Sequence, residues 1–280
     1  MKKIVVLYHN DCRDGFGGAW AAWKKFGKAA EYIPALHQTP PDPKLRGKEI
    51  YSIDFTYFGR PLKELVRRNR HVTIIDHHVT AQPELAHVHE SFFDLKHSGA
   101  VLAWKFFHPR KKVPVLLRYI EDNDLWKFSL PHAKEISAAL GMEPYSFVRW
   151  EKLANDFERT ASRKKYIERG ALILALEDKI VRELASKAEP AQFQGYRAGV
   201  INSPVLQSQL GHELYEHGNF DIGIVWSRQR RMIRVSLRSS QSGKVNVAKL
   251  AKKYGGGGHI SAAGFKFPPN KPLPWKYLKK

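Results

Sequence analysis

Three short runs rich in β-branched residues, each ending at acidic or histidine residues, constrain the fold of this chain more than any other feature. They are Ile4–Tyr8, Glu49–Phe55 and His71–Asp76. Continuous apolar runs of this length are typical of parallel strands that are buried on both faces. Helical patterns lie between and after them, at Ala19–Phe26, Pro61–Asn69 and from Ser98 through Phe107. Strands that alternate with helices predict an α/β fold with a mostly parallel sheet and right-handed crossovers.

The second half of the chain has a different pattern, which predicts a helical connector followed by a smaller α/β domain. Apolar residues recur at helical spacing from about Trp150 to Ala188. Beyond this stretch, Met232–Arg238 alternates apolar and polar residues as a half-buried strand does. A helical pattern over Asn246–Tyr254 then ends in a run of glycines. We expect a first domain at residues 1–150, a helical connector at 151–190, a second domain at 191–268 and a basic tail at 269–280.

The charge balance favours a polyanionic partner. The 280 residues include 47 Lys and Arg against 27 Asp and Glu, which gives a net charge of +20. Such an excess of positive charge favours binding to nucleic acid. A single cysteine, Cys12, excludes an intramolecular disulfide framework. Neither a signal peptide nor an apolar run of membrane-spanning length is present, so we expect a cytoplasmic protein that does not bind membranes.

Acidic and histidine residues follow each of the three apolar runs. They are His9, Asp11 and Asp14 after the first run, Asp54 at the end of the second, and Asp76, His77 and His78 after the third. Ligand sites of open α/β sheets lie outside the carboxyl ends of the strands, so these side chains should gather at one edge. Carboxylates and imidazoles without paired thiolates suit Mn²⁺, or alternatively Mg²⁺, better than structural zinc. The ligands are too many for one ion, which predicts two ions that share a carboxylate, as in enzymes that hydrolyse phosphate esters.

Several motifs occur together in the order in which one enzyme family carries them. They are HNDCRDGFGG, YSIDF, DHH at Asp76–His78, HSGAVLAW, and GGGGHISAAGF near the C-terminus. In this combination the chain resembles the DHH–DHHA1 phosphoesterases, which include RecJ-type exonucleases and nano-RNases. The resemblance covers about residues 4–267 and implies a DHH-type domain followed by a DHHA1-type domain.

The resemblance implies a role for each matching residue of the first domain. Asp54 would bridge two metal ions, His9 would bind the first ion, and Asp14 and His77 would bind the second. His78 would contact the scissile phosphate, and Asp76 would support the ligands from behind. The second ion needs one more carboxylate, for which Asp122 is our choice and Asp124 the alternative.

The first metal site departs from the family pattern. The family usually spaces its first two aspartates two residues apart, whereas Asp11 and Asp14 are three apart. If Asp14 is the second of the pair, Cys12 stands where the first aspartate is usual, and a thiolate is a softer ligand than a carboxylate. Either Asp11 or Cys12 can therefore complete this site, and a small buried cysteine with no ligand role is the simpler interpretation of Cys12.

In the second domain, the resemblance implies substrate-binding roles for Arg238 and for Gly256, Gly257, Gly258 and His259 of the glycine loop. We predict a divalent-metal-dependent phosphodiesterase that hydrolyses short single-stranded RNA or DNA by a two-metal mechanism. One alternative is a small-molecule phosphatase acting on 3′-phosphoadenosine 5′-phosphate, a cyclic dinucleotide or polyphosphate. Another is a nucleic-acid binder without catalytic activity. The oligomeric state is left open.

Overall fold

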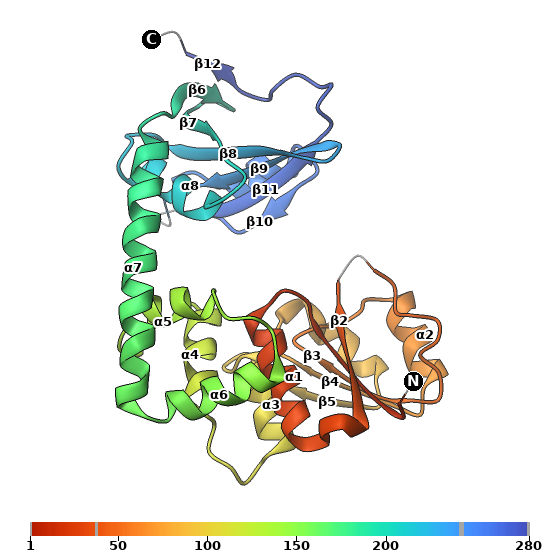
Figure 1. Ribbon diagram of the computed structural model, residues 1–280. Coiled ribbons are helices and arrows are strands. Elements are labelled where there is room, and N and C mark those ends of the chain that lie inside the picture. Colours follow the sequence, from red (N-terminus) through yellow and green to blue (C-terminus); the bar gives the residue numbers. More distant parts are fainter. Residues whose placement is uncertain (1, 37–38, 241–243, 279–280) are drawn as a thin grey trace. The chain divides into compact units, whose positions relative to one another are not determined.

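The computed structural model describes residues 2–36, 39–240 and 244–278. The chain divides into two compact units, Met1–Ile173 and Leu174–Lys280 (Figure 1). Both units combine helices with a β-sheet, which confirms the α/β class and the smaller second domain. Among the described residues, none of the helices is both long enough and apolar enough to cross a membrane.

The N-terminal unit is built on a five-stranded sheet in the order β2-β1-β3-β4-β5. All four strand pairs are parallel, as the alternation of strands and helices predicts. Its strands are β1 (Ile4–His9), β2 (Ala30–Ala35), β3 (Glu49–Ile53), β4 (His71–Asp76) and β5 (Glu90–Phe93).

Helices cover both faces of this sheet, which explains why its central strands β1, β3 and β4 are largely apolar and buried. On one face, Val6 of β1 belongs to a core built with helices α1 (Arg13–Phe26) and α3 (Gly99–Phe107). On the other face, Val5 and Leu7 pack with Leu62 and Leu65 of α2 (Arg60–Arg68). Ser98 caps α3 as predicted, because its Oγ accepts a hydrogen bond from the Val101 N–H at 3.4 Å.

The division between the units falls inside the region 151–190, which we expected to connect the two domains. Trp150, Leu153 and Phe157 are buried in the same core as α1 and α3. The helix that carries them therefore belongs to the N-terminal unit, and the division falls inside the long helix that follows. The N-terminal unit also contains α4 (Val115–Asp124), α5 (Ala133–Leu140), α6 (Phe147–Phe157) and the 3-10 turns η1 (Gly27–Ala29) and η2 (Val79–His87). Helix α7 (Thr160–Ala185) begins in this unit and continues into the C-terminal unit.

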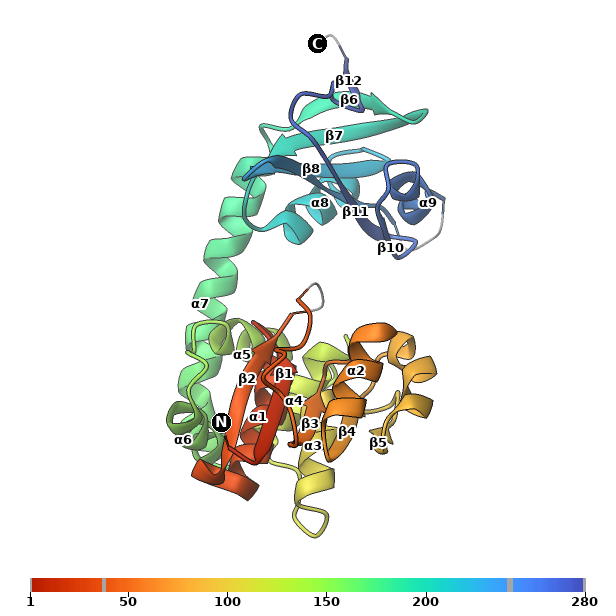
Figure 2. The ribbon, with the colours of Figure 1, turned by 90° about the vertical axis from the view of Figure 1, so that its right-hand side faces the viewer.

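A seven-stranded sheet in the order β10-β11-β9-β8-β7-β6-β12 forms the C-terminal unit. Only β7 and β8 pair in parallel; the other described pairs are antiparallel. Figure 2 shows α8 and α9 beside these strands. The elements are β6 (Glu189–Phe193), β7 (Tyr196–Asn202), α8 (Gln207–Glu216), β8 (Ile222–Gln229), β9 (Met232–Arg238), α9 (Val247–Lys252), β10 (Gly257–Gly258), β11 (Ala262–Phe267) and β12 (Lys276–Tyr277).

Val235 and Leu237 of β9 are buried in the core that includes α9, as its alternation predicts, but Ser236 on the other face is buried as well. The expected basic tail at 269–280 is partly a structural element instead. Trp275 is buried in the same core, and Lys276 and Tyr277 pair with β6. Residues 279–280 of that tail lie outside the described residues.

Candidate metal centre

Three neighbouring strands of the N-terminal sheet end at the same edge, and each supplies candidate ligands there. β1 ends at His9, Asp54 directly follows β3, and β4 ends at Asp76 with His77 and His78 after it. Because β1 is flanked by β2 and β3, the strand order changes direction at this point. Ligands of open α/β sheets bind at such switch points. The structure therefore brings these side chains together as the sequence predicts.

Asp54 lies at the centre of the edge and is 1% exposed. Its backbone has a φ of 54°, the left-handed region that is uncommon for a non-glycine residue and that points to a functional constraint. Neither carboxylate oxygen has a hydrogen-bond partner of good geometry among the described residues. The closest histidine nitrogens are Nε2 of His77 at 3.3 Å and Nδ1 of His9 at 3.5 Å. Burial acts to raise the pKa of Asp54, but these imidazoles outweigh it and lower the pKa to about 2.

A second group of ligands lies around His77. Its Nε2 is buried without a hydrogen-bond partner among the described residues, 3.4 Å from Oδ2 of Asp124 and 3.7 Å from Oδ2 of Asp14. Burial lowers the pKa of His77, but Asp54, Asp14 and Asp124 together raise it to about 9. Buried polar atoms without partners are costly, and a bound cation would satisfy all of them. The donor set of this edge thus fits divalent metal ions.

The N-terminus of α3 holds Asp14 in place. Oδ2 of Asp14 accepts a hydrogen bond from the Gly99 N–H at 2.6 Å, and Oδ1 accepts one from the Ala100 N–H at 3.0 Å. Burial, together with Asp54 and Asp124, still raises the pKa of Asp14 well above its usual range. A side chain at position 99 would place its Cβ 2.6 Å from Cβ of Asp54. Gly99 is therefore a residue of the site. It lies within the HSGAVLAW motif, but we did not predict it as a site residue from the sequence.

The structure brings Asp124, the alternative to Asp122, to the candidate ligands around His77, and it does not bring Asp122 there. Both lie in the last turn of α4, where a separation of two residues turns side chains to different sides of the helix. The buried carboxylate of Asp122 accepts hydrogen bonds from the Ser129 N–H at 2.9 Å, the Ser129 hydroxyl at 2.6 Å and the Leu130 N–H at 3.2 Å. Asp122 therefore holds the loop after α4, and Asp124 takes its place in the candidate ligand set.

Asp76 orients the two histidines that follow it. Its Oδ1 accepts hydrogen bonds from the backbone N–H groups of His77 at 2.7 Å and His78 at 3.0 Å, and lies 2.7 Å from Nδ1 of His78. Its Oδ2 accepts a hydrogen bond from the Thr56 hydroxyl at 2.6 Å. This arrangement leaves Nε2 of His78 at the solvent side, since the side chain is 46% exposed. The hydrogen bond to Asp76 is the main cause that raises the pKa of His78.

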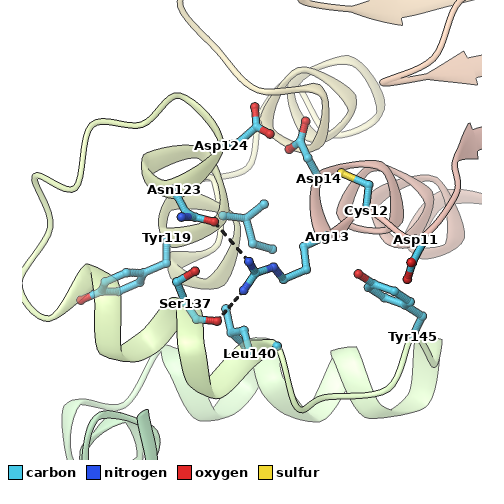
Figure 3. A pocket seen from close by; sticks show the side chains of 12 residues that line it. Asp11, Cys12, Arg13, Asp14, Tyr119, Asn123, Asp124, Ser137, Leu140 and Tyr145 are labelled. Carbon is cyan, nitrogen blue, oxygen red and sulfur yellow. Dashed lines mark hydrogen bonds between the residues drawn. The ribbon is translucent and has the colours of Figure 1, made fainter. Parts of the chain in front are cut away.

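A third group contains His9, Cys12 and Asp54, whose ligand atoms all lie within 4.8 Å of one another. Asp11, the expected oxygen ligand, is absent from the candidate groups found among the described residues. Figure 3 shows Asp11 beside Tyr145, with Cys12, Asp14 and Asp124 toward the other end of a pocket of about 370 Å³. Burial, reinforced by Asp54, raises the pKa of the Cys12 thiol to about 12.

The comparisons with known proteins place this fold in a family. A model of the DHHA1 domain matches residues 206–272. A solved DHH domain from a member of a family of ribosomal proteins superposes over 99% of this chain and 83% of its own, with a TM-score of 0.59 and 12% identity. The C-terminal part of the chain is a DHHA1 domain, and the fold of the chain is that of a DHH-domain protein. An uncharacterized protein of Acanthamoeba polyphaga mimivirus is 30% identical over 94% of this chain and 67% of its own length. The pGpG-specific phosphodiesterase PggH of Vibrio cholerae covers 96% of this chain and 93% of its own, with 12% identity and a TM-score of 0.49.

The DHHA1 region carries the glycine loop predicted from the sequence. Gly258 has a φ of 141°, and a Cβ there would lie 2.5 Å from the Ala262 carbonyl oxygen, so only glycine fits. The loop borders a pocket of about 410 Å³ lined by Arg234, Val235, Gly255, Gly256, Gly257, Gly264, Phe265 and Lys266. The backbone N–H of His259 donates to the Ala262 carbonyl at 2.7 Å, and the His259 residue is exposed.

Arg238, for which the resemblance implies a substrate-binding role, lies outside the lining of this pocket. Its guanidinium donates hydrogen bonds to Oγ of Ser208 at 2.6 Å and Oγ of Ser236 at 3.0 Å, and it packs against Gly211 of α8. Ser208 belongs to the first turn of α8. Among the described residues, the cations that line the pocket of the glycine loop are Arg234 and Lys266. The structure thus does not place Arg238 in the lining of that pocket.

Proposed function

We propose that this protein is a divalent-metal-dependent phosphodiesterase that hydrolyses short single-stranded oligonucleotides. One observation carries the proposal: Asp54 is buried between two groups of candidate ligands, and neither of its oxygens has a hydrogen bond from the described residues. A carboxylate has two oxygens and can serve two ions at once. Such a shared carboxylate is the arrangement that two-metal hydrolysis of phosphate esters uses.

The proposed ligands divide between two ions. His9 and Asp54 would hold the first ion, and Asp14, Asp54, His77 and Asp124 would hold the second. Oxygen and imidazole ligands of the second group suit Mn²⁺, or alternatively Mg²⁺. When bound, the ions would lower the pKa of a water molecule and offset the charge of the phosphoryl group.

The protein's own residues would position the substrate phosphate. Asp76 fixes the ring of His78 through Nδ1, so that the exposed Nε2 can donate a hydrogen bond to a phosphoryl oxygen. Asp76 is buried and fully engaged, so its proposed role is to position His78 and not to touch substrate.

Three features support an oligonucleotide as the substrate. The net charge of +20 favours a polyanion, and Arg234 and Lys266 border the glycine loop of the DHHA1 region. We propose that these cations, together with Arg238, Gly256–Gly258 and His259, bind the phosphates of the chain. Trp126 is 74% exposed two residues after Asp124, and an exposed aromatic ring can stack on a nucleobase.

The test compares two substrates and one variant. Purified protein with Mn²⁺ is incubated with a labelled five-nucleotide RNA and, separately, with bis-p-nitrophenyl phosphate. We expect shortened RNA products, and we expect Asp54→Asn to lower turnover of both substrates by on the order of 10³-fold, since both ions lose a ligand. Asn keeps the size of the side chain but not its charge, so a structural role alone would give a much smaller loss.

The possible outcomes separate the candidate functions. Activity on small phosphate esters alone would favour a small-molecule phosphatase and would contradict the oligonucleotide substrate. RNA binding without hydrolysis of either substrate would indicate a nucleic-acid binder. Full activity of Asp54→Asn would remove the two-metal proposal.

A further inference from the structure

The first metal site contains a sulfur atom where an oxygen was expected. Cys12 directly precedes α1 and has an extended backbone, with φ of −127° and ψ of 132°. Its Sγ lies within 4.8 Å of a ring nitrogen of His9 and of a carboxylate oxygen of Asp54. These three residues come from the end of β1, the start of α1 and the end of β3, so the edge of the sheet itself brings them together.

A cysteine near a histidine is not a metal site by itself, and the state of Asp54 supplies the second observation. Its carboxylate is buried, and no described residue donates a hydrogen bond of good geometry to either oxygen. The histidine nitrogens near it lie at 3.3–3.7 Å without hydrogen-bond geometry. A cation placed among Asp54, His9 and Cys12 would satisfy the buried oxygens that no hydrogen bond from a described residue satisfies.

Asp11 does not lie with His9, Cys12 and Asp54 in the candidate group for the first ion. Its φ of 52° belongs to the left-handed region, and its side chain lies beside Tyr145 along the wall of the pocket in Figure 3. The turn before α1 thus directs the carboxylate of Asp11 away and leaves Cys12 next to His9 and Asp54.

We propose that Cys12 is a thiolate ligand of the first metal ion, and that the two metal sites therefore prefer different ions. The inference rests on the metal binding of the proposed function, though not on its substrate. Thiolates favour softer ions such as Zn²⁺, Co²⁺ and Fe²⁺ over Mg²⁺. The second site, with Asp14, His77, Asp124 and the shared Asp54, has only oxygen and nitrogen donors and suits Mn²⁺ or Mg²⁺.

The experiment is a titration of the metal-free full-length protein with Co²⁺, followed by absorbance. A sulfur atom bound to Co²⁺ gives a charge-transfer band in the near ultraviolet, which oxygen and nitrogen ligands do not give. Because the chain has one cysteine, the band can arise only from Cys12. We expect the band in the wild type, its loss in Cys12→Ser, and its retention in Asp11→Asn.

Two further variants exclude simple binding of Co²⁺ to an accessible thiol. Asp54→Asn should weaken the band strongly, since a site made of several ligands depends on each of them. Cys12→Asp should still bind Co²⁺ without the band, and its preference for Co²⁺ over Mn²⁺ should fall by about tenfold or more.

A chemical readout gives an independent check. Zn²⁺ or Co²⁺ should protect the Cys12 thiol of the wild type from iodoacetamide, whereas Mg²⁺ should not. Co²⁺ binding without the band, or equal alkylation with and without Zn²⁺, would overturn the assignment. If the band appears but the protein does not hydrolyse phosphodiesters, Cys12 is a ligand and the proposed function is wrong. If the protein hydrolyses phosphodiesters without the band, the proposed function stands and Cys12 is not a ligand.

Discussion

At the scale of single residues, the site depends on how closely backbone and carboxylates approach at the sheet edge. Asp14 accepts two backbone hydrogen bonds from the start of α3, and Asp54 lies directly against Gly99. The glycine is required by this contact, because a Cβ would come within 2.6 Å of Cβ of Asp54 and 2.9 Å of Oδ2 of Asp14. Ligand positions at the edge are therefore set partly by a residue that binds nothing.

Gly99→Ala should impair the metal site through this steric conflict. The added methyl group must displace Asp54 or the start of α3, and overpacking of this kind costs about 1–3 kcal/mol of stability. We expect the Mn²⁺ affinity of Gly99→Ala, measured by calorimetry, to be lower than that of the wild type. Gly47→Ala is a useful comparison, because a Cβ there meets no atom within 4 Å, and its φ of 63° makes it a backbone-strain control. Equal Mn²⁺ affinities for both variants and the wild type would contradict the steric argument.

At the scale of secondary-structure elements, the end of α4 separates a structural aspartate from a candidate ligand. Asp122 fastens the loop through Ser129 and Leu130, whereas Asp124 faces His77. The two variants Asp122→Asn and Asp124→Asn make the same chemical change two residues apart, which makes each the control of the other.

Asp122→Asn should lower the free energy of unfolding, by about 1.5–3 kcal/mol, because hydrogen bonds to a charged group are lost. Asp124→Asn should leave chemical denaturation of the metal-free protein nearly unchanged or raise its stability, since burial disfavours its charge and raises its pKa. Its Mn²⁺ affinity and turnover should fall much more than those of Asp122→Asn. The opposite ranking for Mn²⁺ affinity would return Asp122 to the ligand set.

Helices α6 and α7 meet through a second, purely structural charge cluster. The buried Glu143 accepts a hydrogen bond from Nε of Arg149 in α6 at 2.5 Å and another from Arg169 in α7. Burial raises the pKa of Glu143, but these arginines outweigh it and lower the pKa below its usual value. The pair of bonds fixes the start of α7 onto the N-terminal unit.

This lowered pKa predicts how stability depends on pH. The carboxylate of Glu143 binds its proton less tightly in the folded protein than in the unfolded chain. The stabilisation that ionised Glu143 contributes to folding is therefore fully present above the usual pKa of 4.5. It is lost as the pH falls through the lower pKa of the folded protein. Glu143→Gln should lower the free energy of unfolding at pH 7 by about 1.5–3 kcal/mol and flatten its decline below pH 4.5. Urea unfolding at pH 7 and at pH 4 measures both. If the free energy of unfolding of Glu143→Gln falls between pH 7 and pH 4 as much as that of the wild type, other carboxylates cause the fall.

At the scale of the whole molecule, the excess of positive charge and the metal edge have separable roles in the proposed function. The ligands belong to the N-terminal unit, whereas Arg234 and Lys266 belong to the C-terminal unit. Contacts with phosphates depend on salt, because each neutralised phosphate of a single strand adds about −0.7 to the slope of log affinity against log salt. The hydrolysis of a small diester needs only the metal edge.

Arg234→Ala should therefore reduce the salt slope of oligonucleotide binding by about 0.7 and lower the affinity. Hydrolysis of bis-p-nitrophenyl phosphate should be nearly unchanged. Arg67→Ala removes the same charge from an exposed position on α2 and should change the slope little. Fluorescence anisotropy over a range of salt concentrations gives the slopes. Equal slopes for the wild type and both variants would remove Arg234 from the binding surface.

The sequence by itself determined the local elements and the sheet edge where the ligands gather. Strands β1, β3 and β4, the Ser98 cap and the alternation of β9 follow from local periodicity and capping, which act over a few neighbouring residues. The carboxyl ends of parallel strands meet at one edge whatever the loops do, so His9, Asp54 and His77 could be grouped without coordinates.

Only the tertiary structure decided between neighbours that differ in direction. Asp122 and Asp124 carry the same carboxylate, and the rotation of α4 turns them to different sides. Asp11 and Cys12 are adjacent, and the left-handed backbone of Asp11 separates the directions of their side chains. The partners of Arg238, the need for glycine at position 99 and the division of the units inside α7 depend on contacts between distant segments. Such contacts leave no periodic pattern in the sequence, because packing selects them after the local elements have formed.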